Sequence, residues 1–462
     1  MGAHAGVPRQ DALTRPVFGL AIVGLGASLA PLDIAVNVAL PAITGHFKLA
    51  LGDVQWLVIC YVLVYGSLML VCGKLGDLFG HRLIFRIGLV TSAIGCAACA
   101  SAPDWPLFLC ARASQGIGTA LALSCTPALA TSLFGESERT KALAGFAATM
   151  ALATVVGPLL GGVLVELWGW PAVYWVRVPL ALATLVLSRY LPSPRPSPRP
   201  FDALGAVLLA SCMSAFLLSL VLAQRKEVAG WLTLLLLAAA FTVLWIYVRR
   251  AGRVPEPIIR PSLFAEAAFA IPNIMNALAN LASFSILLLT PYYLVNVLKL
   301  SAVTSGIVLA LTFAGSLAGA PLAARLVPRL GQRPTAFLGV ALVGFGLLPL
   351  GFTTAGTPLP LVVMLLIVEG LGQGLLTVAY SDLVTGTLAV RDRGVAGSLS
   401  LLTRTLGTVS GASVLTTLHA YGAGEGGFMA GYRFAFVAAG GGLLAALAIS
   451  CLWPRAWFSR QA

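Results

Sequence analysis

Long apolar runs separated by short polar connections dominate the sequence. About fourteen runs approach the roughly 20 residues that an α-helix needs to cross about 30 Å of hydrocarbon, and the alternation typical of strands is absent. This pattern predicts an all-α integral membrane protein with about fourteen transmembrane helices. The predicted spans are approximately 17–43, 55–73, 84–101, 106–133, 141–165, 172–190, 203–223, 230–248, 268–291, 303–325, 335–352, 359–386, 396–418 and 433–452.

The spans form two groups of six with a pair between them. The Pro-rich segment 191–200 is too stiff and polar to enter lipid, and it separates the first six spans from the next two. The spans 203–223 and 230–248 are almost free of polar side chains, which predicts lipid-facing accessory helices. The predicted domains are an N-terminal six-helix bundle at 1–190, a linker with two accessory helices and a loop at 191–266, and a C-terminal six-helix bundle at 267–462.

Short internal matches indicate that the two groups of six are repeats. The segment 115–121 resembles 369–375 at an offset of 254 residues, and the Gly-x-Arg pattern at 80–82 recurs at 331–333. Repeats in the same orientation around an inserted pair explain both the offsets and the even number of spans.

Composition supports the membrane assignment, and charge adds an orientation. The chain has 462 residues, of which 59% are hydrophobic and 10% charged, so its apolar surface exceeds what a soluble core could bury. Most of the 29 Lys and Arg residues lie in the connections on the side that holds both termini. The positive-inside rule therefore predicts cytoplasmic termini in a plasma or inner membrane. The net charge of +13 then reflects topology and attraction to anionic lipids, and no nucleic-acid partner is expected.

No pattern in the sequence indicates an enzyme or a metal protein. All eight cysteines lie in apolar runs, and the CxxC pair Cys96 and Cys99 has no second ligand pair beside it. We interpret them as small helix-packing residues. No catalytic residue, metal site or cofactor is expected, because no nucleophile motif or ligand cluster is present.

One acid lies in the middle of the first apolar run. A carboxylate at this depth, Asp33, costs several kcal/mol unless it is partnered or protonated, which marks it as a functional candidate. The alternative is an acid at a hydrated helix end, since Pro31 and Pro41 predict bends or a helix end nearby. Asn37 follows one turn later on the same face. Arg112, inside the fourth run, is equally costly, so we expect it to approach Asp33 or to share water with it.

Further polar side chains follow helical spacing. Gln115 and Thr119 share a face with Arg112. The ninth span carries a stripe of Asn273, Asn276, Asn280 and Ser283, and the twelfth carries Glu369, Gln373, Thr377 and Tyr380. We interpret these stripes as the lining of a substrate cavity, with Glu369 as a second protonatable site or cation attractor, and polar contacts between helices are the alternative. Three interpretations of Arg404 stay open: it binds an anionic group, it pairs with Glu369 or Asp382, or it faces cytoplasmic water.

The connection between the second and third spans carries a charged turn. Gly73 permits close helix approach, Asp77 can face the N-terminus of the next helix, and Arg82 follows Gly80 as a basic partner. The turn is a candidate cytoplasmic gate between the two halves, and a generic positive loop is the alternative. Its pattern, Gly-x-Leu-x-Asp-x-x-Gly-x-Arg, resembles the characteristic motif of the major facilitator superfamily.

Other segments resemble the fourteen-helix drug:proton antiporter branch of that superfamily. They are the first-helix motif at 32–41, the fourth-helix motif at 112–118, the antiporter motif at 157–162, the entry to the extra helix pair at 201–205 and a motif at 403–407. Pro171 and Arg177 depart from the usual Trp-Arg-Trp and Asn-Val-Pro pattern at the start of the sixth helix, where Arg177 stands in place of the Asn, and Glu369 stands where an arginine is common. Gly157, Pro158 and Gly161 are expected to form a bend with close helix contact.

The resemblance implies a major facilitator fold that exports lipophilic or cationic drugs across the cytoplasmic membrane by alternating access. It places the first and fourth helices beside a central cavity. We hypothesise that Asp33 binds and releases the coupling proton under the influence of Arg112, and a permanent salt bridge is the alternative. Export of one endogenous metabolite, or symport of a solute with protons, are the alternative functions. The expected partners are a small-molecule substrate, protons and lipids, and the expected state is monomeric.

Overall fold

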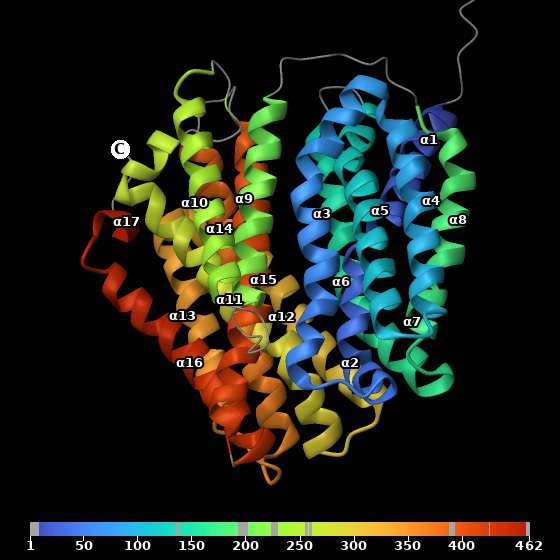
Figure 1. Ribbon diagram of the computed structural model, residues 1–462. Helices are drawn as coiled ribbons and strands as arrows, with labels where there is room; N and C mark the ends of the chain where they lie inside the picture. Colours follow the sequence, from blue (N-terminus) through green and yellow to red (C-terminus); the bar gives the residue numbers. More distant parts are fainter. Residues whose placement is uncertain are drawn as a thin grey trace, which may run out of the picture.

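The chain folds into long helices that run up and down in alternation (Figure 1). The computed structural model describes residues 9–134, 139–192, 202–222, 230–254, 257, 261–387, 393–424 and 426–458. Within these ranges the regular structure is entirely helical, as the apolar periodicity predicts.

The first part of the chain forms one bundle, on the right in Figure 1. Its helices are α1 (Arg9–Ser28), η1 (Pro31–Ile34), α2 (Ala35–Phe47), α3 (Leu51–Phe79), α4 (His81–Ala100), α5 (Trp105–Ser132), α6 (Arg139–Trp168), α7 (Ala172–Trp175), α8 (Arg177–Leu187) and η3 (Ser188–Tyr190).

The rest of the chain forms the accessory pair and a second bundle, on the left in the same view. Its helices are α9 (Ala203–Leu222), α10 (Gly230–Ala251), η4 (Pro261–Ala265), α11 (Ala267–Tyr292), η5 (Tyr293–Val297), α12 (Ala302–Leu330), α13 (Gln332–Leu350), α14 (Leu359–Thr387), α15 (Arg393–Ala423), α16 (Gly427–Ser450) and α17 (Arg455–Phe458).

The helices agree with about fourteen passages through a membrane. In the described residues, 11 helical stretches are long and apolar enough to cross, and the first of them, Pro16–Phe47, joins α1, η1 and α2. Three of the predicted spans, α5, α9 and α15, are not among the 11. The described apolar part of α9 is short, at Leu204–Phe216, and the polar residues of α5 and α15 lower their hydropathy.

The first span is broken where the sequence predicts a bend. Pro31 opens the short 3₁₀ helix η1, which carries Asp33 between α1 and α2. Pro41 lies inside α2, which continues to Phe47, so of the predicted bend or helix end only the helix end is excluded at Pro41. Lys48, in the left-handed conformation with φ of 51°, closes the helix instead.

The two bundles meet at the lower end in Figure 1. The opposite end, where α8 and η3 leave the first bundle and α9 begins, is called the linker end. Thr44 and Tyr292 share a hydrogen bond of 2.6 Å between α2 and α11, and Thr416 donates to Gln55 at 3.2 Å between α15 and α3. Nearby, α6 packs closely on α12, because a side chain at Gly162 or Gly306 would collide with the backbone of the other bundle. Small residues permit such backbone approach in membranes.

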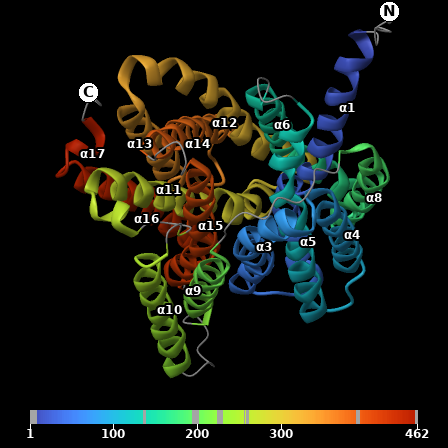
Figure 2. The ribbon, with the colours of Figure 1, turned by 90° about the horizontal axis from the view of Figure 1, so that it is seen from above.

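The accessory helices are not equivalent. Helix α10 exposes large apolar side chains such as Trp231 and Leu234, as predicted for a lipid-facing helix. Helix α9, in contrast, also packs against α3 of one bundle and α15 of the other (Figure 2). The prediction of two purely lipid-facing helices therefore needs correction for α9, whose inner side spans the line where the bundles meet.

Candidate functional site

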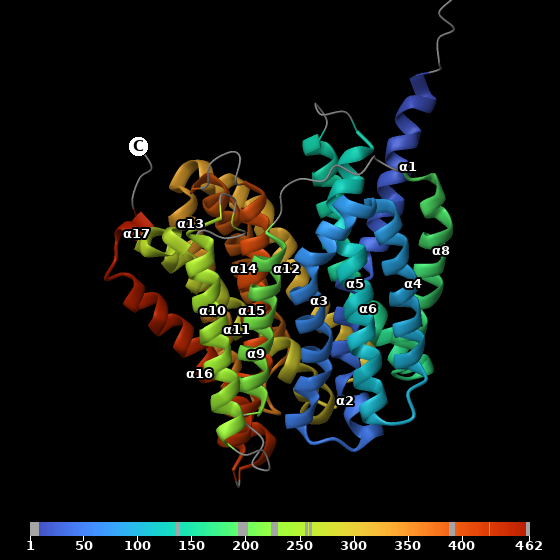
Figure 3. The same cartoon turned by 45° about the horizontal axis from the view of Figure 1, so that its top comes forward.

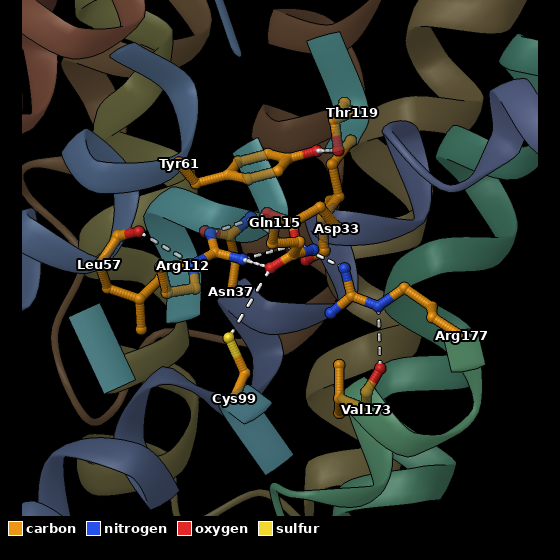
Figure 4. Close-up of polar contacts among 11 residues, drawn as sticks. Asp33, Asn37, Leu57, Tyr61, Cys99, Arg112, Gln115, Thr119, Val173 and Arg177 are labelled. Atoms are coloured by element: carbon orange, nitrogen blue, oxygen red, sulfur yellow. Dashed lines mark hydrogen bonds and ion pairs between the residues drawn. The ribbon is translucent and has the colours of Figure 1, made fainter. Parts of the chain in front are cut away.

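Asp33 lies at the centre of a buried polar cluster in the first bundle (Figure 4). Arg112 of α5 donates to both of its carboxylate oxygens, from Nη1 to Oδ1 at 2.8 Å and from Nη2 to Oδ2 at 2.9 Å. Gln115 donates to Oδ1 at 3.1 Å and accepts from Arg112 at 2.8 Å. The expected approach of Arg112 to Asp33 is confirmed, in a bidentate geometry that favours the charged pair.

The structure adds a second arginine that the sequence argument did not place in the site. Arg177, the first residue of α8, also donates to Asp33 Oδ1 through Nη1, and its Nε donates to the carbonyl of Val173 at 3.0 Å. Its other terminal nitrogen, Nη2, is buried without a hydrogen-bond partner in the described structure. The available signal was the departure of Arg177 from the usual Asn of the sixth-helix pattern.

Each guanidinium group lies against the face of a tyrosine ring. Arg112 lies 4.4 Å from the ring centroid of Tyr61, and Arg177 lies 4.9 Å from that of Tyr174. Cation–π contacts of this kind stabilise a desolvated guanidinium. Tyr61 also donates to Thr119 at 3.3 Å, so the predicted polar face of α5 lies against α3.

The cluster has an uncompensated charge. Two guanidinium ions and one carboxylate sum to a formal charge of +1, and each arginine is 1% exposed while Asp33 is 9% exposed. Asn37 does not change this balance, because its side chain donates to the carbonyl of Ile34 at 3.1 Å. A buried ion cluster with unequal charges is costly to desolvate, which makes this cluster a candidate functional centre.

The second bundle contains one buried acid with different surroundings. Glu369 of α14 is 2% exposed, and Ser283 of α11 donates to its Oε1 at 2.5 Å. The ion pairs of the described side chains do not include Glu369. The buried carboxylate of Asp33 therefore lies between two cations, whereas that of Glu369 has only an uncharged described partner.

The asparagine stripe of α11 bonds to the neighbouring helices. Asn273 accepts from Tyr380 at 2.8 Å, Asn276 donates to Thr403 at 2.9 Å, and Asn280 accepts from Gln373 at 3.1 Å. These bonds join α11 to α14 and α15. The arrangement matches the alternative interpretation of the amides as contacts between helices, while the half-buried Asn280 and Gln373 keep surface free for a ligand.

Arg404 lies on α15 with an exposed side chain. It makes no ion pair with Glu369 or Asp382 among the described residues, so the pairing alternatives do not describe this conformation. Because its side chain is exposed, the two remaining interpretations are that Arg404 binds an anionic group or faces cytoplasmic water.

The charged turn lies where α3 meets α4. Gly80 separates the helices with φ of +98°, a conformation that glycine adopts without strain. Arg82 donates to the carbonyl of Arg189 at 2.8 Å, a contact within the first bundle. Gly73 lies in the last turns of α3, and the side chain of Asp77 lies outside the described residues. The gate role remains a prediction.

The antiporter-motif residues lie beside the break in the first span. Gly157 and Gly161 of α6 face η1 and α2, where a side chain at 161 would collide with Ala35. Pro158 presents its carbonyl to Gly306 of α12 in the other bundle. The expectation of close helix contact is confirmed.

Comparison with known families accounts for the architecture. The sequence profile of the Major Facilitator Superfamily matches residues 17–253 and 273–457. The chain belongs to this superfamily. The profile leaves residues 254–272 unmatched, which include η4 and the first residues of α11. It covers most of the length of the other described helices of this transporter.

Relatives of this facilitator cover most of its length at low identity. The riboflavin transporter RibZ of Clostridioides difficile (strain 630) is 26% identical over 87% of this chain and 88% of its own length. The tetracenomycin C resistance and export protein of Streptomyces glaucescens is 28% identical over 91% and 79%, respectively. The puromycin resistance protein pur8 of Streptomyces alboniger is 29% identical over 87% and 81%.

Solved structures show the same fold. The crystal structure of the POT family transporter PepTSo matches with a TM-score of 0.73 at 12% identity, covering 96% of this chain and 98% of the other. A bacterial homologue of the lysosomal transporter Spinster matches with a TM-score of 0.71 at 16% identity, covering 99% and 100%.

Proposed function

We propose that this facilitator exports small lipophilic or cationic compounds, including antibiotics, in exchange for protons. The observation that carries the proposal is that, among the described side chains, each bundle contains one buried acid, Asp33 in the first and Glu369 in the second. Ionisable residues inside membrane spans mark ion and proton pathways. The relatives named for resistance to tetracenomycin C and puromycin support an exporter. Transport would proceed by alternating access around the line where the bundles meet.

The proposed orientation places the linker end in the cytoplasm. Helices α8 and α10 end at this side of the molecule, at the upper edge of Figure 3. The described arginines at the helix ends and connections of this side include Arg82, Arg189, Arg250, Arg329 and Arg333. The positive-inside rule supports this assignment for a plasma or inner membrane. The described conformation would then be joined on the outer side, where Thr44 contacts Tyr292.

Flux in inverted membrane vesicles tests this function. With an acid lumen, wild-type protein is expected to carry ethidium or puromycin into the lumen while the lumenal pH rises, and an ionophore that removes the pH gradient should stop both. An Asp382→Asn variant, which changes an exposed acid, should behave as wild type. Movement of compound and protons in the same direction would establish symport instead, and absence of flux across a panel of compounds would contradict the proposal.

A carrier for one metabolite is the second candidate. The similarity to the riboflavin transporter RibZ favours it, because that relative is matched over most of both chains. Including riboflavin in the flux panel separates the candidates. Transport of riboflavin without ethidium or puromycin would identify a dedicated carrier, and transport of several unrelated compounds would identify a drug exporter.

A further inference from the structure

The two buried acids differ in how strongly their charged forms are held. Asp33 accepts four hydrogen bonds, three from guanidinium groups and one from Gln115. Each arginine is oriented by a backbone carbonyl at its Nε, Leu57 for Arg112 and Val173 for Arg177. The carboxylate is therefore held from two sides by groups that are themselves fixed.

Arg177 raises the positive charge that the cluster would carry if Asp33 were protonated. With Arg112 alone, a protonated Asp33 would leave one buried cation. With Arg177 present, protonation would leave two guanidinium ions side by side in a site that is almost fully buried. Because like charges at low dielectric repel strongly, the second arginine disfavours protonation of Asp33.

No further charged side chain contacts Asp33 in the described part of the chain. Its other titratable neighbours are phenols and thiols, which are ordinarily neutral near pH 7: Tyr61 and Tyr65 of α3, Tyr174 of α7, and Cys96 and Cys99 of α4. At the same level α6 presents Gly157, and α2 presents uncharged Asn37.

Glu369 has no comparable support. Its described partner is the hydroxyl of Ser283, while α13 presents Gly346 and α12 presents the segment around Thr312. Arg404 of α15 makes no ion pair with it. A buried carboxyl group with one hydroxyl donor and no cation favours its neutral form.

The internal repeat explains the contrast. Glu369 lies 254 residues after Gln115, and Ser283 lies 250 residues after Asp33, so both contacts join the first and fourth helices of a bundle. The acid is on the first helix in one bundle and on the fourth in the other. Leu366 lies 254 residues after Arg112, so the second bundle has no guanidinium at the equivalent place.

Polar side chains line α11 between Glu369 and the linker end of the molecule. Ser283 and Asn280 are half-buried, and the stripe continues towards the start of α11 through the buried Asn276 and Asn273. Thr44 and Tyr292 join the bundles at the opposite end. The stripe therefore supplies hydrogen-bonding groups on the side of Glu369 that faces the linker end.

We propose that Arg177 is a positioning residue that keeps Asp33 charged, and that Glu369 is the group that takes up and releases the coupling proton. The inference rests on the proposed proton-coupled function and assigns its proton to one bundle. Asp33, Arg112 and Arg177 then form a fixed cationic centre. This proposal replaces the sequence-based hypothesis that Asp33 carries the coupling proton.

Infrared difference spectroscopy of the full chain in lipid tests the assignment without a substrate. Lowering the pH should produce the carbonyl band of a protonated, buried carboxyl group in wild type. Glu369→Gln should lose this band, and Asp33→Asn should keep it. Arg177→Asn should gain a second band that is lost again in the Asp33→Asn, Arg177→Asn double variant. Arg177→Lys, which keeps the charge, should gain none.

The outcomes are distinct. A band that disappears in Asp33→Asn and persists in Glu369→Gln would overturn the assignment of the proton, and an unchanged spectrum in Arg177→Asn would overturn the role of Arg177. The expected bands together with absence of flux in vesicles would refute the transport function alone. Flux with the reversed band pattern would refute this inference alone. Because Arg177→Asn introduces the amide common at this position in the related branch, it is suited to fold.

Discussion

At the scale of single residues, the centre around Asp33 shows how a costly charge is accommodated in a membrane protein. Its carboxylate stabilises two arginines that would otherwise repel each other in a buried site. The stability of the first bundle therefore depends on Asp33 more than on either arginine. Removal of one partner from a buried ion pair costs about 3–5 kcal/mol, because it leaves an uncompensated charge.

Asp33→Asn is accordingly expected to lower the free energy of unfolding by about 3–5 kcal/mol. Thermal unfolding in detergent, followed by circular dichroism, measures the effect. Asp382→Asn, at an exposed position, should change stability by less than about 0.5 kcal/mol. The Asp33→Asn, Arg177→Asn double variant should be more stable than Asp33→Asn, and a double variant of lower stability would contradict the charge-balance argument.

At the scale of elements, small residues decide how closely α6 and α12 approach. The carbonyl of Pro158 lies where a side chain at Gly306 would project, and backbone cannot move aside as a flexible side chain can. The antiporter motif therefore sets the packing distance of α6 to two helices, α2 in its own bundle and α12 in the other. Its Gly161 packs within the bundle against Ala35, and Gly162 packs against the other bundle.

Gly306→Ala is expected to cost about 1–3 kcal/mol through overpacking of this contact. Gly442→Ala in α16 provides the matched control, since a side chain there would meet nothing within 4 Å, and it should stabilise the helix by up to about 1 kcal/mol. Thermal unfolding of the two variants measures the difference. Equal effects of the two substitutions would show that the α6–α12 contact carries no packing constraint.

At the scale of the whole molecule, the polar contacts between the bundles identify the conformation. Tyr292 joins the bundles through Thr44, whereas its neighbour Tyr293 donates to the carbonyl of Thr354 within the second bundle at 2.9 Å. The two adjacent tyrosines thus distinguish contacts that must break during alternating access from contacts that persist.

Tyr292→Phe should therefore shift the equilibrium towards the conformation opened at the Thr44 end. A lost hydrogen bond worth about 0.5–1.5 kcal/mol corresponds to a shift of roughly twofold to tenfold in the ratio of the two conformations. Distances between spin labels on α2 and α11 measure that ratio. Tyr293→Phe should leave the ratio unchanged, and an equal shift in both variants would assign the effect to general destabilisation.

The sequence by itself predicted the membrane class and about fourteen spans, with which the helices agree, and it placed Asp33 and Glu369 within apolar runs. The direction of the spans stays a prediction. These predictions depend on local apolar length, on the placement of basic residues and on internal repetition, which are properties of short segments. It also predicted the approach of Arg112 to Asp33, because two isolated charges in lipid have few other ways to reduce their cost.

Only the tertiary structure decided which side chains complete each site. Arg177 lies 144 residues from Asp33 along the chain, and nothing in its own segment indicates that α8 directs it towards η1. The bonds of the asparagine stripe and the dual contacts of α9 likewise depend on helix rotation and packing. Apolar helices pack through small steric differences spread over many residues, so partners across helices follow from the assembled bundle and not from any one span.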